Sequence, residues 1–185
     1  MLQKIKSIIG SSVQVKQQLL ADDTIISTIN NCVEIIVTAF KNGNKVLFCG
    51  NGGSAADAQH LAAEFSGRFY IDRDALPAEA LHCNTSYMTA VANDYSYDVI
   101  YSRLLKGIGN KGDVLVGLST SGNSNNIVKA FETAKEKGIT TIGLTGAGGG
   151  KMKPLSDHLL NVPSTDTPRI QESHCLLYTS PSPRD

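Results

Sequence analysis

The sequence lacks an excess of charge of either sign, and it lacks long apolar runs. Its 185 residues include 17 Lys and Arg against 17 Asp and Glu, so the formal net charge at pH 7 is zero. A balanced charge gives no general attraction to nucleic acids or to anionic membrane surfaces. No apolar run approaches the ~20 residues that a membrane-spanning helix needs. We therefore expect neither a nucleic-acid partner nor a membrane protein.

The chain also lacks paired cysteines and a secretory leader. The four cysteines show neither a CxxC pair nor other close spacing, so we expect reduced thiols at Cys32, Cys49, Cys83 and Cys175. The first six residues lead into an amphipathic pattern, without the apolar core and cleavage site of a signal peptide. From these two features we expect a cytoplasmic protein. The composition, 41% hydrophobic and 18% charged, is ordinary for a globular domain with a proper core.

Two amphipathic helices are predicted before the first strand, over residues 2–20 and 23–41. In both, apolar residues recur with the 3.6-residue period of a helix. The stripe of the first helix comprises Ile5, Ile8, Ile9, Val13 and Leu20. A helix this apolar, with no strand yet to cover, packs either in the core or against another subunit, and the sequence leaves both readings open.

From residue 45 onward, short apolar segments alternate with helical segments. The predicted strands are 45–49, 78–82, 113–118, 140–144 and 158–162, and the predicted helices are 54–65, 86–93, 98–105, 123–137 and one from about 167. This alternation is typical of a parallel sheet buried between two layers of helices. We therefore predict an α/β fold, a three-layer α-β-α sandwich around a central five-stranded parallel sheet, preceded by the N-terminal helices. Ligands of such sheets bind beyond the carboxyl ends of the strands.

Two loops rich in glycine and serine follow the first and third predicted strands. Residues 50–54 read Gly-Asn-Gly-Gly-Ser, and residues 119–124 read Ser-Thr-Ser-Gly-Asn-Ser. Each loop places small residues and unpaired backbone N–H groups at a helix N-terminus, where the helix dipole favours negative charge. Two such loops in one small domain predict a phosphorylated ligand.

Two other phosphate-binding motifs fit less well. Residues 50–55 match the G-x-G-x-x-A pattern of dinucleotide-binding folds, but no acidic residue clearly ends the second strand, which closes on residues 82–84. The glycine run over 146–150 fails the P-loop pattern, because Thr145 replaces its first glycine and Met152 replaces the residue that holds Mg²⁺. We therefore expect no nucleotide cofactor, and a loop after the fourth strand.

A histidine and a carboxylate share one face of the helix that follows the first loop. His60 and Glu64 are four residues apart and could hold one ligand or metal together, although such pairs are also common as plain surface hydrogen bonds. Gln171, near the start of the last predicted helix, could add an oxygen ligand. Asn93 and Asp94 follow a short helix, where they suit either sugar hydroxyls or a helix C-terminal turn.

Taken together, these segments resemble the sugar isomerase (SIS) domain family, and within it the phosphoheptose isomerases. The matching segments occur in family order and span residues 1 to about 174; they are 49–54, 57–64, 66–68, 93–94, 119–124 and 169–172. The resemblance implies a flavodoxin-like SIS domain over 43–174, with a helical extension over 1–42 that packs in a homotetramer. It also implies conversion of sedoheptulose 7-phosphate to D-glycero-D-manno-heptose 7-phosphate, the first step toward the ADP-heptose of lipopolysaccharide cores.

The resemblance further implies roles for individual residues. The phosphate would be held by Ser119, Thr120, Ser121 and Ser124. The substrate would also contact Asn51, Gly52, Gly53, Glu64, Asn93, Asp94 and Gln171. One zinc ion per subunit would be held by His60, Glu64 and Gln171, with Glu64 also the general base. This chemistry is sensible, because moving a carbonyl between C2 and C1 requires proton abstraction through an enediolate and stabilisation of an oxyanion.

The last helix departs from the family at one position. Five residues beyond the histidine that matches His174, the family carries a second histidine, both zinc ligand and general acid; here that position is Thr179. At about 100° per residue, His174 would lie about 140° around the helix from it and is a poor substitute. Residues 175–185 resemble a translated sequencing adapter, and Pro181 and Pro183 would stop a helix. We expect a non-native tail and an inactive chain.

A protein of another class is the alternative. A similar, non-enzymatic SIS protein binds the bacterial replication initiator as a tetramer, and the missing histidine would suit that function. Against it, the trio of His60, Glu64 and Gln171 has no purpose in a pure adaptor. Isomerases and etherases of amino-sugar phosphates usually carry other catalytic signatures, which this sequence does not show.

Overall fold

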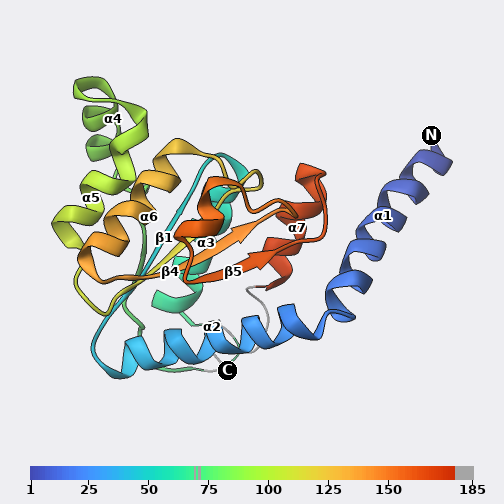
Figure 1. Ribbon diagram of the computed structural model, residues 1–185, viewed down its shortest axis with the longest axis horizontal. Coiled ribbons are helices and arrows are strands. Elements are labelled where there is room, and N and C mark those ends of the chain that lie inside the picture. The colour runs from blue at the N-terminus through green and yellow to red at the C-terminus, as the bar shows by residue number, and fades with distance from the viewer. Residues whose placement is uncertain (69, 71, 178–185) are drawn as a thin grey trace.

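The chain folds into a layered α/β body from which one long helix extends. The structure is a computed structural model that describes residues 1–68, 70 and 72–177 (Figure 1). Its first two elements are α1 (Leu2–Leu20) and α2 (Asp23–Lys41), which confirms both helices that the apolar periodicity predicts.

All five predicted strands are present and form one parallel sheet. They are β1 (Val46–Gly50), β2 (Ala78–Ala80), β3 (Val114–Leu118), β4 (Thr140–Thr145) and β5 (His158–Asn161). Their order across the sheet is β2-β1-β3-β4-β5, and every neighbouring pair is parallel. In this order the direction of winding reverses between β1 and β3. The carboxyl ends of these two strands are therefore the switch point at which ligands bind in such folds.

The remaining helices also match the prediction, with two short additions. They are α3 (Gly53–Ser66), α4 (Thr85–Asp94), α5 (Ile100–Ile108), α6 (Asn125–Lys137) and α7 (Thr167–Leu177). The predicted helix over 98–105 begins as a separate 3₁₀ turn, η1 (Tyr97–Val99), before α5. The loop predicted after the fourth strand leads into a second 3₁₀ helix, η2 (Gly150–Leu155), which the sequence pattern did not indicate.

Alternate residues of the strands face two separate cores. Phe48 of β1 packs in one core with Phe65 of α3, together with residues of α1, α2 and α7. Its neighbour Leu47 packs in the other core with Phe131 of α6, together with residues of α4 and α5. Successive strand residues point to opposite faces of a sheet, so one strand serves both cores. The three-layer α-β-α sandwich is confirmed.

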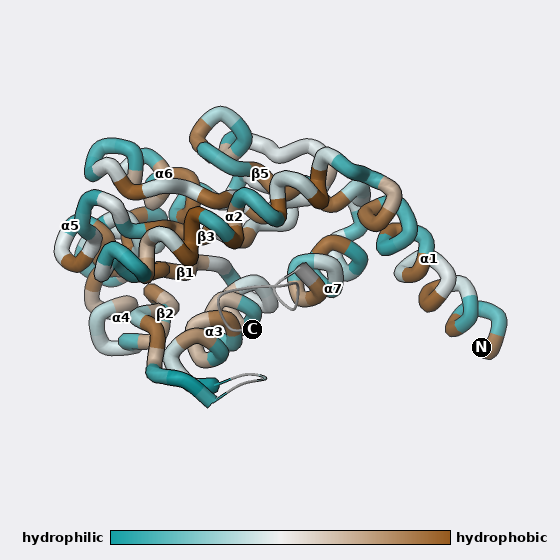
Figure 2. The backbone as a smooth tube through the Cα atoms, turned by 90° about the horizontal axis from the view of Figure 1, so that it is seen from below, coloured by the Kyte–Doolittle hydropathy of each residue, from teal (hydrophilic) through white to brown (hydrophobic). Residues whose placement is uncertain are grey.

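Helix α1 leaves this sandwich and points outward (Figures 1 and 2). Only its C-terminal half reaches the core, through Val15 and Leu19, which are buried. Among the helices that the structure describes, none is both long and apolar enough to cross a membrane.

Candidate functional site

The first glycine-rich loop joins the end of β1 to the start of α3. Gly52 precedes the helix with a φ of 56°, in the region that favours glycine, and the Cβ that another residue would add at Gly50 would collide with the carbonyl group of Ser54. Gly53 opens α3, so its N–H and that of Gly52 have no carbonyl one turn before them within the helix. The loop therefore offers backbone donors at a helix N-terminus, as the sequence predicts.

The second loop begins beside the first, because Gly50 and Leu118 are partners in the β1–β3 register. The Oγ atoms of Ser119 and Ser124 lie 3.1 Å apart, and Ser119 is buried. Gly122 lies between them with a φ of 65°, and an added Cβ there would collide with the carbonyl oxygen of Gly149. The structure thus brings two of the four predicted phosphate hydroxyls together at the start of α6.

The other two hydroxyl residues of this loop face a different space. Thr120 and Ser121 line a cavity of about 210 Å³ together with residues 146–148, 164, 165, 167 and 170. Ser121 also folds the loop locally, because its Oγ accepts from the N–H of Asn123 at 3.1 Å. The pairing of Ser119 with Ser124 is therefore the tighter cluster within the predicted phosphate site.

An acidic residue accompanies the predicted metal pair on α3. The Nε2 atom of His60 lies 3.4 Å from Oε1 of Glu64, with side-chain exposures of 51% and 17%, which confirms that they share one face. Asp57 lies one turn earlier. Burial raises the pKa of its carboxyl group, while the charge of the neighbouring His60 lowers it. Asp57 is thus coupled electrostatically to His60, a contact that the sequence analysis did not single out although the three-residue spacing along the helix favours it.

The last helix brings Gln171 to the first loop. An added Cβ at Gly53 would collide with Nε2 of Gln171, so the amide lies against the first residue of α3. His60 lies seven residues further along the same helix, about two turns away. Three residues beyond Gln171, His174 is fully buried, and its Nε2 lies 3.3 Å from the carbonyl oxygen of Thr145. Position 179, where the family has its second histidine, lies outside the described residues.

The predicted sugar-binding pair stands apart from the loops. Asn93 and Asp94 end α4, both are exposed, and Nδ2 of Asn93 donates to Oδ1 of Asp94 at 3.0 Å. The chain then turns through η1, whose Tyr97 donates to Oδ1 of Asn51 in the first loop at 3.0 Å. The segment that follows this pair therefore reaches the first loop, while the pair itself bonds internally.

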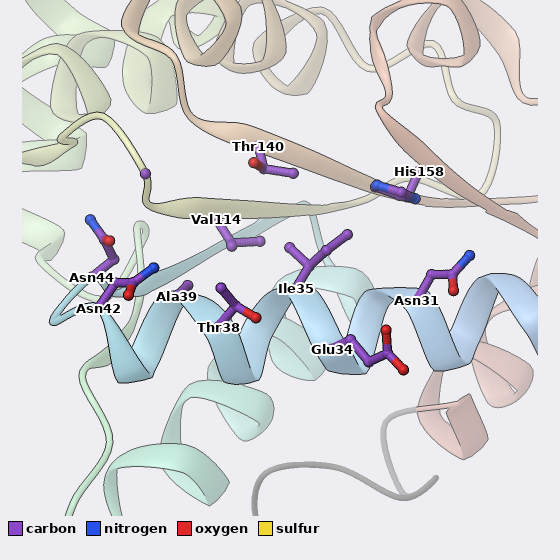
Figure 3. Close-up of a pocket in the computed structure, with 11 residues that line it drawn as sticks. Asn31, Glu34, Ile35, Thr38, Ala39, Asn42, Asn44, Val114, Thr140 and His158 are labelled. Carbon is purple, nitrogen blue, oxygen red and sulfur yellow. The ribbon is translucent and has the colours of Figure 1, made fainter.

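A larger cavity lies at the opposite end of the sheet and does not belong to this site. About 560 Å³ in volume, it is lined by α2 and by the first residues of three strands, Val114, Thr140 and His158 (Figure 3). Parallel sheets bind substrates beyond the carboxyl ends of their strands, and this cavity lies at the amino ends. The loops after β1 and β3 remain the candidate site.

Comparisons with known proteins agree with this geometry. The sequence model of the SIS domain family matches residues 12–146. A phosphoheptose isomerase of Aneurinibacillus thermoaerophilus is 54% identical over 173 residues, which cover 94% of this chain and 87% of that protein. The structure of a phosphoheptose isomerase from Neisseria gonorrhoeae superimposes with a TM-score of 0.91 at 41% identity, covering 97% of this chain and 96% of that one. One from Francisella tularensis has a TM-score of 0.92 at 36% identity, covering 96% and 94%.

Proposed function

The chain belongs to the phosphoheptose isomerases of the SIS domain family, and on this premise we propose that its two glycine-rich loops bind the substrate. The protein is a sugar-phosphate isomerase that converts sedoheptulose 7-phosphate to D-glycero-D-manno-heptose 7-phosphate. The observation that carries the proposed site is the pairing of the Ser119 and Ser124 hydroxyls, 3.1 Å apart at a helix N-terminus. The non-enzymatic alternative, a partner of the replication initiator, is not favoured by these relatives.

The proposed roles follow the two ends of the substrate. The phosphate is bound by the hydroxyls of Ser119, Thr120, Ser121 and Ser124, with the dipole of α6 adding to their donors. The sugar is bound by Asn51, Gly52, Gly53, Asn93, Asp94 and Gln171. Glu64 takes a proton from C1 and returns it to C2, while the proton of the C1 hydroxyl passes to the oxygen on C2, so the carbonyl moves from C2 to C1.

A zinc ion is the proposed cofactor. An imidazole nitrogen and a carboxylate oxygen are typical zinc ligands, and the 3.4 Å between His60 and Glu64 suits two donors to one ion. The amide of Gln171 would be the third ligand. Within the part of the chain that the structure describes, no cluster of three or more His, Cys, Asp or Glu side chains could hold a metal, and our proposal therefore includes an amide ligand. When bound, zinc would stabilise the oxyanion that forms during proton transfer.

Further proposals concern the organisation of the protein. We assign residues 1–42 to an oligomerising extension, residues 43–174 to the SIS domain and residues 175–185 to a non-native tail. The exposed apolar stripe of α1 supports the first assignment, because such a surface requires a partner. A cytoplasmic homotetramer acting on a soluble phosphorylated heptose is the assembly that we propose.

The test is aldose formation from sedoheptulose 7-phosphate with added zinc. We expect little turnover from the chain as it stands, because Thr179 occupies the position of the proposed acid. Replacing residues 175–185 with a native-type helix that carries histidine at position 179 should raise turnover. Adding Glu64→Gln to that variant should lower it by a factor of about 10²–10⁴, the contribution of a positioned base.

Glu136→Gln, an exposed change on α6, provides the matched control and should leave turnover unchanged. Deuterium exchange at the carbon beside the carbonyl group separates proton abstraction from product release. Undiminished exchange in the Glu64→Gln variant would exclude Glu64 as the base. Aldose formation by none of the variants that carry histidine at 179 would contradict the proposed function.

A further inference from the structure

Two asparagines tie the two loops of the site together through a reciprocal pair of hydrogen bonds. Nδ2 of Asn51 donates to Oδ1 of Asn126 at 2.9 Å, and Nδ2 of Asn126 donates to Oδ1 of Asn51 at 2.8 Å. Asn51 belongs to the loop after β1, and Asn126 lies in the first turn of α6, directly after the loop that follows β3. The pair therefore spans the switch point between the two strands.

Asn126 is held in the orientation that this pair needs. Asn126 is 2% exposed, and its Oδ1 also accepts a hydrogen bond from the N–H of Ile127 at 3.0 Å. A carbonyl oxygen has two lone pairs, so the acceptor capacity of Asn126 is filled by Asn51 and Ile127. A buried amide with these partners cannot rotate without leaving polar groups unpaired, which costs free energy. Asn126 therefore presents a fixed donor to Asn51.

Two tyrosines hold the first loop from its other side. The hydroxyl of Tyr97 donates to Oδ1 of Asn51 at 3.0 Å, which fills the second lone pair of that oxygen. The hydroxyl of buried Tyr101 donates to the carbonyl oxygen of Gly50. Both lone pairs of Oδ1 of Asn51 thus accept hydrogen bonds within the protein, one from Asn126 and one from Tyr97. The loop therefore presents the backbone N–H groups of Gly52 and Gly53 to a ligand, and not Oδ1 of the Asn51 side chain.

We propose that Asn126 and Tyr97 are positioning residues for the isomerase, which lock Asn51 and so set the distance between the first loop and the phosphate loop. A seven-carbon sugar phosphate that touches both loops requires that distance to be fixed, whereas a ligand held by the second loop alone does not. This inference rests on the proposed function for its substrate, but the locked loop is a property of the chain itself.

We call the hydrogen bonds from Asn126 and Tyr97 that hold Asn51 the lock. The substitution Asn126→Asp tests the lock by replacing only the side-chain amide with a carboxyl group. A carboxylate cannot donate to Oδ1 of Asn51, so the pair loses one hydrogen bond and gains a repulsion between two acceptors. A protonated carboxylic acid restores both bonds, because its O–H donates and its other oxygen accepts. The lock in this variant should therefore fail near pH 8 and recover near pH 5, where burial favours the protonated acid.

Calorimetry with sedoheptulose 7-phosphate measures this recovery as the ratio of each variant's affinity to that of the parent chain at the same pH. We expect Asn126→Asp to bind about tenfold more weakly than the parent at pH 8 and within about threefold of it at pH 5. Asn126→Leu, which cannot donate at any pH, should remain weak throughout. Asn125→Asp is the matched control, since it adds the same charge to an exposed neighbour in the same helical turn.

The substitution Tyr97→Phe is a second test of the proposal, and it changes no charge. It should weaken sedoheptulose 7-phosphate binding severalfold and leave the affinity for inorganic phosphate unchanged, because phosphate alone uses the second loop. If Asn126→Asp and Asn125→Asp lose affinity equally at both pH values, charge repulsion explains the loss and the positioning role is wrong. Equal losses for sugar phosphate and inorganic phosphate in Tyr97→Phe would overturn it as well.

A final measurement separates this inference from the proposed function. Hydrogen exchange of the Ser54 and Ala55 amides, which donate to the carbonyl oxygens of Asn51 and Gly52 at 3.1 Å each, reports on the lock in the unliganded chain without any substrate. Faster exchange in Asn126→Leu and Tyr97→Phe than in the parent supports the lock even if sedoheptulose 7-phosphate fails to bind, in which case only the substrate assignment is wrong. Unchanged exchange in both variants would contradict the lock itself.

Discussion

Among single residues, His174 combines complete burial with an incomplete set of hydrogen bonds. It is fully buried, and its Nε2 lies 3.3 Å from the carbonyl oxygen of Thr145. Its Nδ1 is buried without a hydrogen-bond partner among the residues that the structure describes. Loss of solvation lowers the pKa of this imidazole to about 4, although the bond to Thr145 acts in the opposite direction. The ring is therefore neutral in the folded chain at neutral pH.

This depressed pKa predicts a loss of stability in acid. Between the unfolded value of 6.5 and the folded value of about 4, the unfolded chain binds the proton and the folded chain does not. Stability is therefore full above pH 6.5 and falls as the pH drops toward 4, by roughly 3 kcal/mol for this residue. Urea unfolding between pH 4 and 7.5 measures the slope, which His174→Gln should reduce.

His158→Gln is the control for that slope, because it removes a histidine from the amino end of β5 and leaves His174 in place. Burial also lowers the pKa of His82, so this residue likewise reduces stability in acid. His82 is present in both variants, and its contribution therefore cancels in the comparison. An unchanged slope in His174→Gln would show that another group causes the acid sensitivity.

The residues of the site differ in how well the sequence reveals them. The sequence predicts that His60 and Glu64 share a face, because four residues make about one helical turn, and in the structure Nε2 of His60 and Oε1 of Glu64 lie 3.4 Å apart. Both loops were predicted because glycine and serine act locally at a helix start. By contrast, Asn126 bonds to a residue 75 positions away, and an asparagine after Ser124 carries no local signal of that partner. Contacts that depend on the register of β1 beside β3 appear only with the fold.

At the scale of elements, α1 is clamped to the helix that carries Gln171. Arg169 of α7 donates from Nη1 to the carbonyl oxygen of Ile8 at 2.8 Å, and its Nη2 lies 3.3 Å from Glu172. Lys16 of α1 reaches the same Glu172 at 3.2 Å. Burial alone would raise the pKa of Glu172, but the hydrogen bonds from Ser12 and Lys16 and the charges of Lys16 and Arg169 lower it. These contacts, which we call the clamp, join α1 to α7, the helix that carries the proposed metal ligand Gln171.

The two cations of this clamp should contribute unequally to stability. The side chain of Arg169 is 12% exposed and bonds to a backbone carbonyl, so Arg169→Ala should cost about 2 kcal/mol. Lys16 is 34% exposed, so Lys16→Ala should cost about 1 kcal/mol or less. Thermal unfolding measures both, with a fall in Tm of roughly 4–8 °C expected for Arg169→Ala. Equal shifts in the two variants would show that the backbone contact adds nothing.

The predicted elements could be read from the sequence because each depends on a short stretch of chain. Strand limits differ by one or two residues from those predicted, as with 78–82 against the observed Ala78–Ala80. The exception is η2, which Gly149 precedes with a φ of 70° and Gly150 opens with a φ of 54°. A glycine run permits many backbone paths, so composition alone predicts a loop and not the turn that follows it.

For the whole molecule, the exposed apolar stripe of α1 supports the homotetramer that we propose. The residues of this stripe, Ile5, Ile8, Ile9, Val13 and Leu20, are 47%, 48%, 58%, 48% and 77% exposed. Figure 1 shows α1 extending away from the sandwich, so its own chain leaves this stripe uncovered. A homotetramer built on α1 would bury it.

Placing charge on the stripe should therefore dissociate the assembly without unfolding the sandwich. Ile5→Lys with Ile9→Lys puts two ammonium groups where apolar contacts are expected, and burying an unpaired charge costs several kcal/mol. Sedimentation should then report the mass of a single chain, 19.7 kDa, in place of four times that mass. Ser7→Lys with Gln14→Lys adds the same charge to the far side of α1 and should keep the tetramer. Because the body of each subunit carries its own two cores, circular dichroism should remain that of a folded α/β protein in both variants. A parent chain that sediments at 19.7 kDa would contradict the tetramer and leave the stripe to another partner.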